Sequence, residues 1–259
     1  MAWFPIANVI NQRALIFELS ILNLKMRFKG AYLGLIWAGL EPLLIFLLLY
    51  TVFTSIRVGI EEDFGMYLLS GILIYHIFTR GTLSGMQSLR SNISILKSFK
   101  MEKESFPVSS TLTTAILSII EVSILIILMP FFQFTPNLTI ILLPISIGLL
   151  LLLILGFSYL LSIANVFMKD IQPIWAVVVQ TLLFISPIFW YLKDVNELLL
   201  NIHLINPIGQ LIEINHKIIL LGEIPPLIDW LYTSAFVFGI LFLGFAVFRK
   251  NQQKIIEAL

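Results

Sequence analysis

The sequence contains no cysteine, which excludes disulfide bonds, thiolate metal sites and cysteine nucleophiles. Charged residues are also scarce: they make up 12% of the 259 residues. Soluble globular domains carry about a quarter charged residues. Hydrophobic residues, in contrast, make up 59% of the chain. A surface of this composition could not stay in water unassisted, so we expect a protein that crosses a membrane several times.

Motifs of soluble enzymes are missing as well. There is no Gly-x-x-x-x-Gly-Lys-Ser/Thr loop for ATP phosphates and no His-Glu-x-x-His pair for zinc. The three histidines, His76, His203 and His216, are scattered, and we interpret them as polar residues with partners rather than metal ligands. We therefore expect no catalytic residue, metal or cofactor in this chain. We also expect no cleavable signal peptide, because residues 1–5 lack a basic region.

Long apolar runs predict an all-α membrane protein that forms one transmembrane domain over residues 1–259. Each run has the length of about twenty residues that a helix needs to cross the hydrocarbon core. Pro42 lies inside the first run and should bend that helix. The six predicted spans are 34–56, 66–88, 108–132, 138–165, 172–191 and 227–248.

Two further segments have apolar patterns that do not suit a span. Between residues 5 and 29, apolar residues recur every three to five positions with polar and basic residues between them. This spacing predicts an amphipathic helix that lies along the membrane interface or packs against another protein. Residues 195–224 hold two short apolar pieces, interrupted at Asn206-Pro207. Such pieces are typical of re-entrant or interfacial helices.

The cations indicate the orientation of the spans. With six spans and the N-terminus inside, twelve cations fall in inside segments and three outside, so both termini should be cytoplasmic. The inside cations are Arg13, Lys25, Arg27, Lys29, Arg90, Lys97, Lys100, Lys103, Lys169, Arg249, Lys250 and Lys254. The outside cations are Arg57, Lys193 and Lys217, and Arg80 falls within a span. Residues 195–224 are then extracytoplasmic.

Three ionisable residues, Glu41, Arg80 and Glu121, lie within predicted spans. Charges in a bilayer are costly and usually pair or face a cavity. We expect Arg80 to pair with Glu41 or Glu121, or to line a cavity; the alternative is that Arg80 or Glu41 snorkels to an interface. In an ion-coupled carrier, the two glutamates would be the coupling sites.

The segment 89–106 is cytoplasmic in this topology and connects two spans directly. It mixes apolar residues such as Ile93, Leu96 and Phe99 with cations. An amphipathic segment of this kind could bind a soluble partner and pass its motion to the helices. The alternative interpretation is a solvated charged linker.

Several short motifs, in this order and spacing, resemble the permease subunits of type-two ABC exporters that move polysaccharides such as O-antigen, capsule or teichoic acid. The similarity covers most of the chain, although Lys169 stands where the family has arginine, which leaves bidentate pairing there in doubt. The motifs are the cationic 25–29 segment followed by Leu33-Gly34, Trp37 and Glu41-Pro42, then Gly71 to Phe78, Ser88 to Lys97, Phe106-Pro107, Lys169-Asp170-Ile171, Ser186-Pro187-Ile188-Phe189-Trp190 and Asn206-Pro207.

The resemblance implies a multi-pass protein of the cytoplasmic membrane that forms a homodimer and docks two copies of an ATP-binding subunit. ATP and Mg would bind to that subunit, a lipid-linked polysaccharide would be the substrate, and nucleic acid would not be a partner. Lys169 and Asp170 would hold the cytoplasmic end of the fourth and fifth spans. The docking residues would be Arg90, Ser91, Asn92, Leu96, Lys97, Phe99 and Lys100.

Aromatic walls suit a glycan, because sugar rings present apolar C–H faces, although tryptophan and tyrosine also gather at bilayer interfaces for other reasons. The candidates for the translocation path are Trp37, Glu41, Tyr50, Tyr75, Phe78, Arg80 and Trp175. Three alternatives remain open at this point: an ABC exporter of a drug or small lipid, an ion-coupled secondary carrier, and a polytopic enzyme that modifies glycolipids.

Overall fold

The computed structural model describes residues 12–56, 61–98 and 102–255. These residues form helices and turns and contain no strand, which confirms the all-α prediction. The α-helices are α2 (Arg13–Arg27), α3 (Trp37–Ile56), α4 (Phe64–Ser91), α5 (Ile93–Ser98), α6 (Ser105–Leu128), α7 (Leu143–Phe167), α8 (Ile171–Ile185), α9 (Glu197–Leu204), α10 (Pro207–His216) and α11 (Leu227–Asn251). The short turns are η1 (Gly34–Ile36), η2 (Met129–Phe132), η3 (Leu138–Leu142), η4 (Leu192–Asp194), η6 (Gln252–Lys254) and the π-helical turn η5 (Lys217–Leu221).

Four helical stretches of the described chain are long and apolar enough to cross a membrane: Gly34–Ile56, Ser105–Phe132, Leu138–Phe167 and Leu227–Lys254. The chain is therefore an integral membrane protein. Helix α8 is apolar but has only 15 residues. Helix α4 has 28 residues but carries more polar side chains. A count of six crossings stays a prediction that depends on α4 and α8.

The most polar long helix, α4, lies at the centre of the bundle. It contacts α3, α6, α7, α8 and α10, and most of its residues are buried. Large side chains such as Phe64, Leu69 and Phe78 fill the core around it. This placement follows from the bilayer, because apolar helices can face lipid whereas a helix with polar residues must be shielded by its neighbours.

Helices α7 and α11 approach each other closely at two glycines. A Cβ atom on Gly244 would lie 2.3 Å from the carbonyl oxygen of Gly156. A Cβ atom on Gly156 would lie 2.9 Å from the backbone of Leu241. Small residues of this kind let membrane helices pack backbone against backbone.

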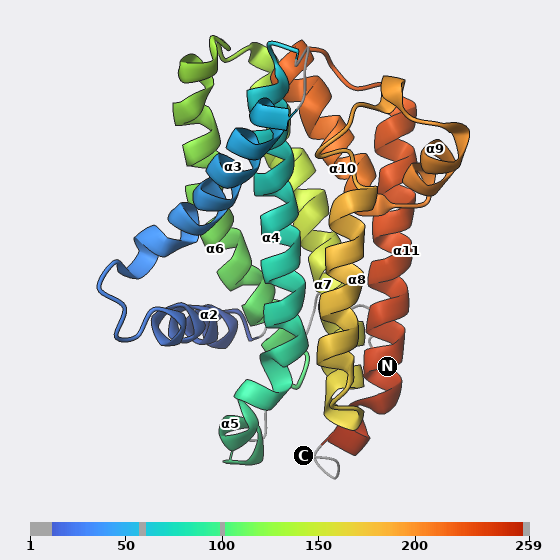
Figure 1. Ribbon diagram of the computed structural model, residues 1–259. Coiled ribbons are helices and arrows are strands. Elements are labelled where there is room, and N and C mark those ends of the chain that lie inside the picture. Colours follow the sequence, from blue (N-terminus) through green and yellow to red (C-terminus); the bar gives the residue numbers. More distant parts are fainter. Residues whose placement is uncertain (1–11, 57–60, 99–101, 256–259) are drawn as a thin grey trace.

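Helix α2 crosses the bundle nearly at right angles to the long helices and packs on α6 (Figure 1). Its buried Ser20 donates a hydrogen bond to the carbonyl of Ser109 at 3.1 Å, and Thr113 donates to the carbonyl of Ser20 at 3.1 Å. Phe17 and Met26 are exposed on the helix surface. The described part of the predicted amphipathic helix thus has one packed face and one free face; residues 5–11 lie outside the described residues.

Several boundaries differ from the predicted ones, two of them substantially. Helix α8 ends at Ile185 rather than at residue 191, because Pro187 forces Ser186 into an extended conformation (φ −81°, ψ 148°). The segment 89–106 is only partly a loop, since α4 continues to Ser91 and α5 follows at once. Leu96 of α5 is buried in a second apolar cluster with Leu19, Phe106 and Phe248. That cluster joins α2, α5, α6 and α11 at one end of the molecule.

The two ends of the bundle differ. Helix α5 and the last residues of α11 lie at one end, which we call the α5 end, and α9 and α10 lie at the other, which we call the α10 end (Figure 1). At the α10 end, Lys193 pairs with Glu61 at 2.5 Å, and the hydroxyl of Tyr191 donates to Asp63 at 2.9 Å. These contacts hold residues 61–63 against the α8–α9 connection. The re-entrant interpretation of α9 and α10 stays a prediction.

Candidate functional site

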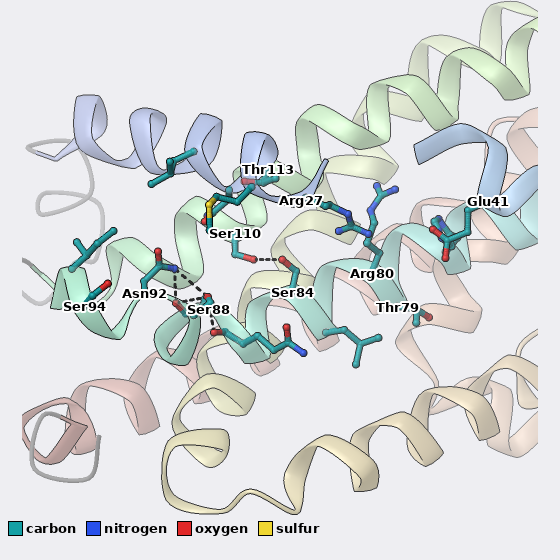
Figure 2. A pocket seen from close by; sticks show the side chains of 18 of the residues that line it. Arg27, Glu41, Thr79, Arg80, Ser84, Ser88, Asn92, Ser94, Ser110 and Thr113 are labelled. Atoms are coloured by element: carbon teal, nitrogen blue, oxygen red, sulfur yellow. Dashed lines mark hydrogen bonds and ion pairs between the residues drawn. The ribbon is translucent and has the colours of Figure 1, made fainter. Parts of the chain in front are cut away.

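A polar cleft of about 830 Å³ opens beside the second half of α4. Helix α2 and the start of α3 form one wall, α4 forms the floor, and α5 and α6 complete it (Figure 2). We call it the α4 cleft. Its lining is Leu22, Asn23, Met26, Arg27, Glu41, Ile45, His76, Thr79, Arg80, Leu83, Ser84, Gln87, Ser88, Ser91, Asn92, Ser94, Ile95, Ser110 and Thr113.

The contribution of α4 to this cleft is a single helix face. Its lining residues recur at spacings of three and four, which is the period that places side chains on one side of an α-helix. These residues are His76, Thr79, Arg80, Leu83, Ser84, Gln87, Ser88 and Ser91. All but Leu83 are polar. This stripe is not among the predicted site residues, although its polar residues at helical spacing are visible in the sequence of 64–91.

An ion-pair network between α3, α4 and α6 lies at one end of the cleft. Arg80 donates from Nη1 to Oε1 of Glu121, and both side chains are buried, at 5% and 0% exposure. His76 lies between two carboxylates: its Nδ1 is 3.3 Å from Oε2 of Glu121, and its Nε2 is 3.6 Å from Oε2 of Glu41. Of the alternatives left open by the sequence, Arg80 therefore pairs with Glu121 and not with Glu41.

The network links three helices, since Glu41 is on α3, His76 and Arg80 are on α4, and Glu121 is on α6. Buried charges in a membrane protein need such partners, because an unpaired charge would retain its full desolvation cost. The two carboxylates contact opposite nitrogens of the His76 ring, so they do not converge on one point. No group of three acidic or histidine ligands with metal-site geometry occurs within the described ranges.

Neutral polar groups line the rest of the cleft. Ser110 donates to the hydroxyl of Ser84 at 2.9 Å, which ties α6 to α4 (Figure 2). Asn92 donates to the carbonyl of Ser88 at 2.9 Å at the end of α4. A hydroxyl- and amide-rich wall with arginines at one end can bind a polar, hydroxyl-bearing molecule that carries negative charge.

The predicted docking residues lie around the end of α4 and on α5. Arg90 lies 3.4 Å from the carbonyl of Val166, Ser91 donates to Gln87, and Asn92 is buried. Leu96 anchors α5 in the second apolar cluster, and Lys97 is exposed. Phe99 and Lys100 lie outside the described residues. The docking role stays a prediction.

The predicted path residues do not lie together. Trp37 is exposed and Glu41 borders the cleft, whereas Tyr50 stacks on Phe46 at 5.5 Å between ring centroids. The remaining aromatics are buried between helices of this chain. The hydroxyl of Tyr75 donates to the carbonyl of Val179, and Trp175 donates from Nε1 to Thr82 at 3.2 Å.

Phe78 contacts Phe157 edge-on at 5.8 Å, and Phe157 lies 5.2 Å from the ring of Trp175. Three of the seven path candidates, Tyr75, Phe78 and Trp175, thus form part of the packing between α4, α7 and α8. Lys169 and Asp170 are exposed in the tight turn between α7 and α8. The path and turn roles stay predictions.

Residues 15–220 match the ABC-2 type transporter family. This match covers most of the chain. The chain belongs to the ABC-2 type transporter family. The resemblance drawn from the short motifs is thereby confirmed at the level of this transporter family.

The curated relatives are transport and export proteins. The chain is 24% identical over 257 residues to the polysialic acid transport protein KpsM of Escherichia coli, covering 95% of this chain and 97% of that one. It is 22% identical over 242 residues to the O-antigen export system permease protein RfbA of Klebsiella pneumoniae, covering 92% of each chain. It is 21% identical over 192 residues to RfbA of Myxococcus xanthus, covering 74% of each.

Proposed function

We propose that this chain is the transmembrane subunit of an ATP-driven exporter that moves a lipid-linked polysaccharide out across the cytoplasmic membrane. The observation that carries the proposal is similarity over nearly the whole chain to transport proteins for polysialic acid and O-antigen. The short loops support it too, since the described chain has no room for a catalytic or nucleotide-binding domain between its helices. ATP and Mg would bind to a separate subunit.

We propose six crossings with both termini in the cytoplasm, and with the α5 end on the cytoplasmic side. Three features support this orientation: Arg90 and Lys97 lie at the α5 end, Arg249 and Lys250 end α11, and α9 and α10 are at the opposite end. Cations collect on the cytoplasmic side of membrane proteins because cationic flanks resist translocation. In this orientation α4 and α8 supply the second and fifth crossings.

The ATP-binding subunit would dock at the α5 end. Helix α5 is short and exposed on its outer side at Lys97, yet it is fixed to the bundle through the buried Leu96. The same apolar cluster contains Leu19 of α2 and Phe248 of α11. A force on α5 would therefore reach α2 and α11 through packed side chains. By the family resemblance, two copies of the chain and two of the ATP-binding subunit form the exporter.

The test is co-expression of the chain with the ATP-binding subunit encoded beside it, followed by purification through a tag on the permease. We expect the ATPase to co-purify in equal amount and to hydrolyse ATP. Lys97→Glu at the α5 end should weaken co-purification. Glu223→Lys, a charge reversal at an exposed residue between η5 and α11, is the control and should not.

The cargo is then identified in a strain that lacks the permease. Loss of a surface polysaccharide, restored by the intact chain, would support the proposed substrate class. A stoichiometric complex without any change in surface polymer would instead indicate an exporter of a drug or small lipid. Failure of a folded permease to bind any ATPase, with transport driven by an ion gradient, would contradict the proposal.

A further inference from the structure

Several residues that line the α4 cleft carry buried hydrogen-bond donors without a partner. Arg80 is 95% buried, yet its Nε and Nη2 groups have no hydrogen-bond partner. The hydroxyls of Thr79 and Ser88, on the same helix face, are also buried without a partner. Buried polar groups are normally satisfied, because an unpaired one costs roughly 1–3 kcal/mol. The donors along this face of α4 are therefore short of acceptors.

The carboxylates nearby do not meet this need. Both oxygens of Glu121 are engaged, Oε1 by Arg80 and Oε2 by His76. Glu41 lies toward the nitrogen of His76 that faces away from Glu121. A guanidinium has five N–H donors and no acceptor, so Arg80 can satisfy Glu121 and still bind a second anionic oxygen.

A second cation lies next to these donors. Arg27, near the end of α2, lines the cleft, and Figure 2 shows its guanidinium beside that of Arg80. Burial and the charge of Arg80 lower the pKa of Arg27, while Glu41 and Glu121 raise it. Two guanidinium groups facing one space repel each other unless an anion lies between them.

We propose that the α4 cleft binds the phosphate group of a lipid, with Arg80 and Arg27 holding the phosphate oxygens and the hydroxyl-rich wall contacting the polar group attached to it. Phosphate fits because a planar guanidinium pairs two of its oxygens at once. The wall beyond it offers Ser84, Gln87 and Ser110, whose side chains suit sugar or glycerol hydroxyls.

The position of the cleft suits a lipid. Helix α2 has an amphipathic sequence and exposed apolar side chains, including Leu22 and Met26 at the cleft itself. A headgroup could enter beside α2 while its hydrocarbon tail remained in the membrane. The volume of about 830 Å³ is within the range of roughly 300–1,000 Å³ found for small-molecule sites.

Two sources share this chemistry: the phosphate that links a glycan to its lipid, and the headgroup of an anionic phospholipid. Assignment to the transported lipid rests on the proposed export function. The probes are therefore a polyprenyl diphosphate, the matching polyprenol without phosphate, and phosphatidylglycerol. Binding is measured with the full chain in phosphatidylcholine nanodiscs, using native mass spectrometry or a radiolabelled probe.

The variants separate the site from general attraction of cations to the membrane. Arg27→Gln removes one guanidinium from the cleft. Because Arg27 makes no ion pair with Glu121, this change leaves the buried pair of Arg80 and Glu121 intact. Lys25→Gln removes the same charge two residues away on an exposed position outside the cleft, and is the matched control. A double variant, Arg80→Gln with Glu121→Gln, removes the buried pair without leaving one charge alone. Thermal unfolding verifies that each variant is folded.

We expect the diphosphate to bind at least about tenfold more tightly than the polyprenol, and Arg27→Gln to reduce that binding on the order of tenfold. Lys25→Gln should bind as the parent does. Displacement by phosphatidylglycerol would assign the site to phospholipid headgroups, and no displacement would assign it to the polyprenyl diphosphate. Both support a phosphate site.

Equal binding of diphosphate and polyprenol would overturn the proposal, and so would unchanged binding by a folded Arg27→Gln. A similar loss in Lys25→Gln would also overturn it, since the effect would then be general attraction to anionic lipid. Co-purification of the ATP-binding subunit is measured on the same variants. If co-purification is normal while phosphate binding fails, the phosphate site is wrong and the exporter assignment stands. If phosphate binding is normal while the ATP-binding subunit does not co-purify, the exporter assignment is wrong and the phosphate site stands.

Discussion

The α4 cleft and the α10 end both contain buried polar residues, but they use them differently. At the α10 end, Asn206 donates to Ser186 at 3.0 Å, and Asn215 donates to Ser146 at 2.7 Å. Gln210 donates to the carbonyl of His203 at 3.2 Å. We call this set the α10 network. Its amide N–H groups are bonded to other parts of the chain, and they fix α10 against α7 and the α8–α9 connection.

Both regions also hold buried polar atoms without a partner, but these atoms differ in kind. At the α10 end they are the amide oxygens of Asn206 and Asn215 and one ring nitrogen each of His203 and His216. In the α4 cleft they are donors, namely two N–H groups of Arg80 and the hydroxyls of Thr79 and Ser88. A bilayer supplies no water to such groups in its core, so a buried charged donor without an acceptor needs an anionic ligand or entering water. Polarity alone therefore does not mark a site in a membrane protein; the cleft differs because its unpaired groups include a guanidinium.

The largest effect is expected from the buried ion pair. Glu121→Leu leaves Arg80 buried without its carboxylate and should cost about 3–5 kcal/mol of stability. The double variant Glu121→Leu with Arg80→Leu should recover much of that loss, because no single charge remains. Thermal and denaturant unfolding in detergent measure both. A double variant that is less stable than Glu121→Leu would show that the loss of stability does not come from the unpaired charge of Arg80.

A smaller effect is expected from the α10 network. Asn206→Ala removes the hydrogen bond to Ser186 and should cost about 1–2 kcal/mol. Export per folded molecule should stay the same, because the network is structural. Surface polymer divided by the amount of membrane-inserted protein is the measurement. Loss of export in a fully stable variant would contradict this, because the α10 end would then take part in transport directly.

The cleft wall should give the opposite result. Gln87→Ala removes an exposed amide from the cleft and should change stability by less than about 0.5 kcal/mol. Export should fall several-fold if the wall contacts the transported headgroup. Gln172→Ala, an exposed amide at the start of α8, is the control and should export normally. Equal export by both variants would show that the cleft wall does not contact the transported headgroup at Gln87.

The smallest effect concerns Glu104, just before α6 at the α5 end. Its carboxylate is buried, with Nε of Arg249 at 3.4 Å. Burial raises the pKa of Glu104, while Arg249 lowers it and Glu102 raises it. At pH values between the unfolded and the folded pKa of Glu104, the folded protein holds a proton that the unfolded chain has lost.

Between the unfolded and the folded pKa, stability should therefore fall as the pH rises. The variant Glu104→Gln should flatten that slope, as measured by melting temperature across the acidic range. A slope that remains the same in the variant would assign it to other groups.

Sequence reasoning finds what one segment determines by itself. Runs of leucine and isoleucine predict long helices, and Pro187 marks the end of α8, although the predicted boundary overlooked it. Glu41, Arg80 and Glu121 stand out because charges are rare in spans. The pairing of Arg80 with Glu121 could not be predicted. The two residues are 41 positions apart in the sequence, and Glu41 is an equally suitable partner by residue type.

The α4 cleft could be predicted only in part. The polar stripe from His76 to Ser91 is visible at helical spacing, but whether a polar stripe is covered depends on its neighbours. Here α6 approaches through Ser110, and α2 crosses above with Arg27. The aromatic residues also show that residue type alone does not reveal position. Tyr75 and Trp175 have side chains that suit a glycan path, but they lie in the packing between helices.

The most direct test of the account is transport by the reconstituted complex. Inverted membrane vesicles that hold the chain and its ATP-binding subunit are given a lipid-linked glycan on the outside, and glycan sequestered in the lumen is measured. The account predicts uptake that requires ATP and is abolished by leaving out the ATP-binding subunit, but is unaffected when ion gradients are collapsed. Uptake driven by a proton or sodium gradient without ATP would contradict it, and would make Glu41 and Glu121 the coupling residues to study.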